Sequence, residues 1–179
     1  MAQIEEMWGH QDTLFKQITE SGDWGHEHGA DWTFADVPYH LAYCNHDLVA
    51  RAVECGRDLP AEEQIAFNSP ADVNAWNAHK FAERPADQTV EQTLAQLQAS
   101  RDEIRRVAAG LTDADLERPT WFPFIFGMGD GWVPASMPLN FCLTHDWSEF
   151  MQLRIHAGAE APVPSPGITS QYLGAMIGM

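Results

Sequence analysis

Positive charge is scarce in this chain of 179 residues. Lys and Arg total 10 against 26 Asp and Glu, which gives a formal net charge of −16. A surface this acidic repels phosphate backbones and anionic lipid, so we expect neither nucleic acid nor a membrane surface as a partner. The sequence also lacks an apolar run of about 20 residues, the length that crosses a bilayer.

Cysteine is scarce as well, with only Cys44, Cys55 and Cys142. An odd number at such wide spacing does not fit a disulfide framework. The first residues, MAQIEEMWGH, have neither the basic start nor the apolar stretch of a signal peptide. We therefore expect free thiols and a cytoplasmic location.

Several familiar catalytic motifs are missing. GMGDG at 127–131 is not followed by the helix and lysine of a phosphate-binding loop, and no H-E-x-x-H helix is present. Residue spacing supports no Ser-His-Asp or Cys-His arrangement. The chain is nevertheless 45% apolar, which favours one folded domain over a disordered chain.

Helical periodicity is the main feature that is present. Apolar residues recur every three to four positions in four stretches, near 2–20, 36–54, 70–111 (interrupted at Pro85) and 136–156. Helix caps are predicted at Ser69, Thr89 and Ser136. We expect an all-α fold, a four-helix bundle over residues 1–157, followed by a Pro/Gly-rich tail over 158–179.

An aromatic segment precedes the last predicted helix. Residues 117–135 hold three prolines, three glycines and five aromatic residues, so a regular helix is excluded and only a few residues could form a strand or hairpin. Exposing these rings would be costly, so the segment should be either a lid on the bundle or the wall of an apolar substrate pocket. The predicted pocket residues are Trp121, Phe122, Phe124, Phe126, Trp132 and Asn77.

Three residues suggest a metal site. His145 and Glu149 lie four residues apart on the last predicted helix, so both side chains point the same way, as paired ligands do in bundle metal sites. Either they are an ordinary boundary pair or they share a site with His40, which alone would be a typical core histidine. Two imidazoles and one carboxylate would leave positions open for water or substrate, as in catalytic metal sites.

Other candidates have weaker support. Cys44 follows His40 by four residues and could add a thiolate ligand, although a buried, inert thiol is more common. His26 and His28 alternate in a glycine-containing loop, and both could reach one metal only from an extended or turned backbone. His156, at the end of the last helix, is favourably placed for the helix dipole and needs no further role.

Four segments together resemble the DinB/YfiT-like metalloenzyme family over residues 1–157. They read DWTFADVPYHLAYCNHD, ADVNAWN, GLTDADLERP and CLTHDWSEF. The resemblance implies a four-helix bundle with up-down-down-up topology. Relatives include bacillithiol S-transferases and mycothiol-dependent maleylpyruvate isomerase, which implies a low-molecular-weight thiol as a cofactor.

The resemblance also implies a ligand set. His40 matches the family's histidine on the second helix, and His145 matches the first position of the H-x-x-x-H pair on the last helix. Glu149 stands where many relatives have the second histidine. The resemblance to the isomerase branch implies one Glu and one His at the same spacing, in the opposite order. The implied metal is zinc or nickel, with iron an alternative, and the implied assembly is a homodimer.

Two functional hypotheses follow. One is a metal-dependent hydrolase, thiol transferase or isomerase that acts on a small molecule. The other is a non-catalytic bundle that binds a metal or ligand. An open coordination position beside a cavity would favour the enzyme, and a fourth protein ligand such as Cys44 would favour the structural role.

Overall fold

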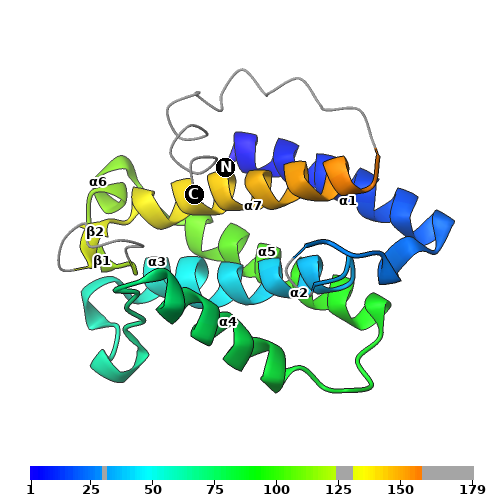
Figure 1. Cartoon of the computed structure of the whole chain (residues 1–179). Helices are drawn as coiled ribbons and strands as arrows, with labels where there is room; N and C mark the ends of the chain where they lie inside the picture. Colours follow the sequence, from blue (N-terminus) through cyan, green and yellow to red (C-terminus); the bar gives the residue numbers. More distant parts are fainter. Residues whose placement is uncertain (30–31, 124–130, 159–179) are drawn as a thin grey trace. The chain divides into compact units, whose positions relative to one another are not determined.

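The computed structural model describes residues 1–29, 32–123 and 131–158, and this part of the chain is mostly helical (Figure 1). Each predicted periodic stretch is helical, and the third is interrupted as expected. The all-α prediction is confirmed; the up-down-down-up arrangement stays a prediction. The chain divides into two compact units, which are described separately: residues 1–38 with 140–179, and residues 39–139.

The first unit contains α1 (Ala2–Ser21) and most of α7 (Ser136–His156). The predicted apolar stripe of α1 is buried, and Gly22 ends the helix in a left-handed conformation, with φ of 79°. Side chains of α1 hold α7: Trp8 Nε1 donates to Asp146 Oδ2 at 3.0 Å, and Gln11 Nε2 donates to the Asp146 carbonyl at 2.8 Å. Both contacts are buried.

The loop after α1 folds back on itself. It begins with the short helix η1 (Asp23–Gly25). Phe34 N then donates to the His26 carbonyl at 3.0 Å, and His28 N donates to the Trp32 carbonyl at 2.8 Å. Alternate residues of an extended segment share a face, and both histidine rings contact the Phe34 ring, at centroid distances of 4.9 and 6.1 Å.

The second predicted helix is helical from Asp36 to Cys55 but is not one regular α-helix. It consists of α2 (Asp36–Tyr43), the π-helical segment η2 (Cys44–Ala50) and α3 (Arg51–Cys55). Apolar periodicity did not predict the π-helical part. Such segments are rare and frequently lie at functional sites. Two short 3₁₀ turns follow, η3 (Gly56–Asp58) and η4 (Ala61–Glu63).

The second unit contains three further helices, two of which follow predicted caps. They are α4 (Pro70–Glu83), α5 (Val90–Ala109) and α6 (Asp113–Leu116). Ser69 and Thr89 each form a capping box with the residue three positions on. α6 is a short helix with a capping box from Thr112. In contrast, α7 begins at Ser136 itself, the residue expected to precede it.

The Thr89 cap gives a direct test of the fold. Thr89 Oγ1 accepts from Gln92 N at 3.3 Å, and Thr89 N donates to Gln92 Oε1 at 2.8 Å. Thr89→Ala should destabilise the protein by about 1 kcal/mol in chemical denaturation, because one capping bond is lost. Thr13→Ala, at an exposed position within α1, is the control and should be neutral or stabilising, because alanine is the better helix former.

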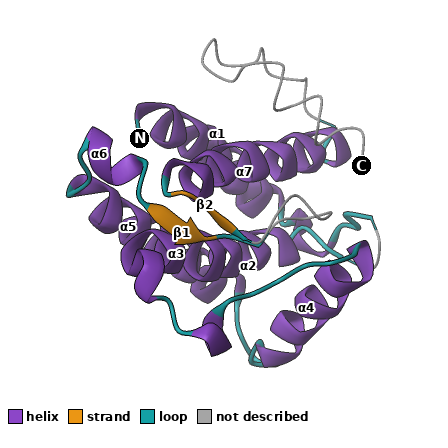
Figure 2. Ribbon diagram, turned by 90° about the vertical axis from the view of Figure 1, so that its left-hand side faces the viewer, coloured by secondary structure: helices purple, strands orange, loops and turns teal. Residues whose placement is uncertain are grey.

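Part of the aromatic segment forms a hairpin. β1 (Pro119–Trp121) pairs antiparallel with β2 (Trp132–Pro134), beside α3 (Figure 2). Thr120 Oγ1 donates to the Ala52 carbonyl. Gly131 has a φ of 89°, and a Cβ there would lie 2.6 Å from the Trp121 ring, so only glycine fits.

None of the helices within the described residues is both long and apolar enough to cross a membrane.

Candidate metal centre

One ring nitrogen of His40, Nδ1, forms a hydrogen bond with Tyr43. It lies in the last turn of α2 and is 5% exposed. Its Nδ1 lies 2.6 Å from the Tyr43 hydroxyl, which itself donates to Asn77 Oδ1 at 2.9 Å. Because the hydroxyl hydrogen is used on Asn77, the hydroxyl oxygen accepts from His40 Nδ1–H. We therefore assign the lone pair to Nε2, the nitrogen left to bind a metal.

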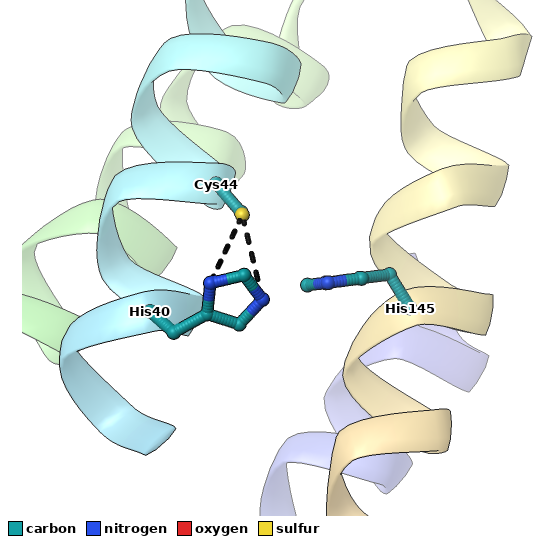
Figure 3. A group of neighbouring side chains, drawn as sticks. All are labelled: His40, Cys44 and His145. Carbon is teal, nitrogen blue, oxygen red and sulfur yellow. Dashed lines mark hydrogen bonds between the residues drawn. The ribbon is translucent and has the colours of Figure 1, made fainter. Parts of the chain in front are cut away.

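Cys44 lies one turn after His40, at the first residue of η2. Its side chain is buried, and Sγ lies 3.8 Å from each ring nitrogen of His40 (Figure 3). Thiolate sulfur and imidazole nitrogen together are a ligand set that suits zinc.

His145 lies on α7 among carboxylates. Its ring stacks on Phe141 at a centroid distance of 4.8 Å. Nδ1 lies 3.6 Å from Asp146 Oδ1, and Nε2 lies 4.0 Å from Glu149 Oε1. Burial lowers the pKa of His145, but the neighbouring Asp146 carboxylate and the charge of Glu149 outweigh it, so the pKa lies above its ordinary value.

Glu149 lies between two histidines of the first unit. While Oε1 approaches His145, Oε2 lies 3.9 Å from His28 Nε2. The predicted pairing of His145 with Glu149 on one face of the helix is therefore present. The Glu149 carboxylate thus approaches two imidazoles, and the sequence did not predict the approach to His28.

His40, Cys44 and His145 each offer one atom able to bind a metal, and these atoms all lie within 4.8 Å of one another (Figure 3). Ligand atoms on one zinc ion are about 3.3–3.6 Å apart, given bonds of about 2.0–2.3 Å in a tetrahedron. The three donor atoms are therefore candidate ligands of one ion. Glu149 is not a member of it.

Those predicted pocket residues that the structure describes lie in the second unit. Asn77 is half-buried, and its Oδ1 accepts a hydrogen bond from the Tyr43 hydroxyl. The Trp121 and Trp132 rings meet at a centroid distance of 5.6 Å, and Phe122 is buried. Their hairpin packs on Ala52, several helical turns after His40. That these rings line the approach to a metal stays a prediction, and Phe124 and Phe126 lie outside the described residues.

Comparison with known proteins gives one match. A family model described as the DinB superfamily matches residues 3–152. Neither a curated protein nor a solved structure gives a significant match.

Proposed function

The chain belongs to the DinB superfamily, and from this premise we propose that it is a metal-dependent enzyme acting on a small molecule, with His40, Cys44 and His145 as metal ligands. The observation that carries the proposal is the spacing of their three donor atoms, all within 4.8 Å. The hydrogen bond from His40 Nδ1 to Tyr43 supports it, because a hydrogen on Nδ1 places the metal-binding lone pair on Nε2.

Three protein ligands fit a catalytic centre better than a structural one, because a structural zinc site uses four. When bound, the ion would lower the pKa of water or of a low-molecular-weight thiol and so provide a nucleophile for hydrolysis, thiol transfer or isomerisation. Zinc suits the thiolate and imidazole set; nickel and iron are alternatives.

The surrounding residues have distinct roles in this proposal. Tyr43 and Asn77 fix the tautomer and direction of His40. The Asp146 carboxylate, 3.6 Å from His145 Nδ1, favours a proton there and directs Nε2 toward the metal. The sequence indicates Glu149 as the third ligand, and its ligation stays a prediction. The bundle topology and a homodimer also remain proposals, and the tail over 159–179 lies outside the described residues.

The alternative is a non-catalytic metal-binding protein, favoured by the burial of Cys44 if Glu149 also binds. Cobalt-substituted protein distinguishes the two. An enzyme with an open position should change its visible spectrum when a small thiol such as 2-mercaptoethanol is added. A spectrum unchanged by excess thiol, with cobalt bound, would indicate a closed structural site.

Two matched variants identify the third ligand. Cys44→Ser should lower zinc affinity by at least about 100-fold in competition with a chromophoric chelator, because a direct bond is lost. Glu149→Gln should lower it by only about 10–100-fold, the usual effect of a group that supports a ligand. The reverse order would assign the third position to Glu149 instead of Cys44.

A further inference from the structure

A second pair of histidines meets within the first unit. His28 Nδ1 and His156 Nδ1 lie 3.0 Å apart, and the two rings cross at 77°. His28 comes from the folded-back loop and its side chain is only 2% exposed, whereas His156 is the exposed last residue of α7. Neither histidine belongs to the proposed centre at His40, Cys44 and His145.

Two imidazole nitrogens at this distance need a proton or a cation between them. If both carried hydrogens the hydrogens would clash, and two lone pairs would repel each other, so the nitrogens share either one proton or one cation. The distance alone fits both. Two nitrogens bound at about 2.0–2.1 Å to one ion lie about 2.8–3.4 Å apart for bond angles between 90° and tetrahedral.

The other nitrogen of His28 indicates which tautomer it adopts. Nε2 is buried and, among the described residues, has no hydrogen-bond partner. Glu149 Oε2 lies 3.9 Å from this nitrogen. A carboxylate on this side favours the hydrogen on Nε2, which leaves the Nδ1 lone pair directed at His156. Metal-binding histidines are commonly oriented in this way by a carboxylate behind the ring.

His156 also borders open space. It lines a cavity of about 480 Å³ whose walls include Asp23, His26 and Phe34. An ion held by the two Nδ1 atoms would therefore have water on its remaining positions. Asp23 and His26 supply further oxygen and nitrogen donors along the same cavity wall.

We propose that His28 and His156 bind a second divalent transition-metal ion, of the kind that prefers imidazole, such as Cu²⁺ or Zn²⁺. Glu149 orients His28 from behind, and water from the cavity completes the coordination. This site is distinct from the centre at His40, Cys44 and His145 and does not depend on any activity there.

Copper titration tests the proposal in a chain that lacks the other ligands. In the His40→Ala/Cys44→Ser background, Cu²⁺ should bind with one equivalent per chain, and its electron paramagnetic resonance spectrum should show coupling to two imidazole nitrogens. Adding His156→Ala should weaken binding at least tenfold, because one of two ligands is lost. His156 is exposed, so this variant should fold normally.

His79→Ala is the matched control, since this α4 histidine is 70% exposed and takes no part in the pair; it should leave copper affinity unchanged. No binding in the background variant, or equal binding with and without His156, would overturn the proposal and indicate a shared proton between the rings. Either result leaves the proposed function to its own tests, because the background variant already lacks that centre.

Discussion

His145→Ala is expected to abolish metal binding at the proposed centre and to lower the melting temperature of zinc-loaded protein. A ligand present at about 100 times its dissociation constant stabilises the folded state by about 2.7 kcal/mol. For a chain of this length, each kcal/mol corresponds to roughly 2–4 °C. The expected loss is therefore roughly 5–11 °C, measured by calorimetry with free zinc held at about 100 times its dissociation constant.

A chelator supplies the matching control for this experiment. Removing zinc from the wild type should lower its melting temperature by at least the loss seen in His145→Ala, and the variant itself should respond less to chelator than the wild type does. Exposed His79→Ala should keep the wild-type response. If chelator lowers the melting temperature of His145→Ala as much as that of the wild type, His145 is not a ligand.

Trp8→Ala is expected to be the most damaging single change to stability. Trp8 is 1% exposed, and its indole donates to the fully buried carboxylate of Asp146. Truncating a buried tryptophan typically costs about 3–5 kcal/mol, because apolar contacts are lost and a cavity remains. Chemical denaturation of the metal-free protein measures this loss separately from any metal effect.

Trp8→Phe separates packing from hydrogen bonding at the same position. It keeps most of the ring but removes the donor to Asp146, which should cost about 1–3 kcal/mol. Trp132→Phe, at a tryptophan that is 38% exposed, should cost less. Equal losses for the two Trp→Phe variants would show that the buried bond to Asp146 contributes nothing particular to stability.

The helices were predictable because their signals are local. Ser69 and Thr89 cap their helices through residues only three positions away, and the α1 stripe repeats within one turn. The π-helical stretch after Tyr43 was not predictable, because apolar spacing over so few residues fits an α-helix equally well. This stretch matters for the candidate site because its first residue is Cys44, a proposed metal ligand.

The candidate site was predictable in part for the same reason. The spacing of four residues predicts that His145 and Glu149 lie on one helix face, and their side chains approach to 4.0 Å. The same spacing joins His40 to Cys44, which was the weaker candidate in the sequence. Tyr43, three residues after His40, could have been recognised as a partner on the same helix face. The contact between His28 and His156 spans 128 positions, and no local pattern predicts it.

Elemental analysis of wild-type and His40→Ala protein tests the central claim most directly. Both proteins, purified without a metal-affinity tag, are incubated with excess zinc and desalted before the metal is counted. Because only the centre at His40, Cys44 and His145 differs between them, the wild type should carry about one zinc ion more per chain. Equal metal content in the two proteins would contradict the account.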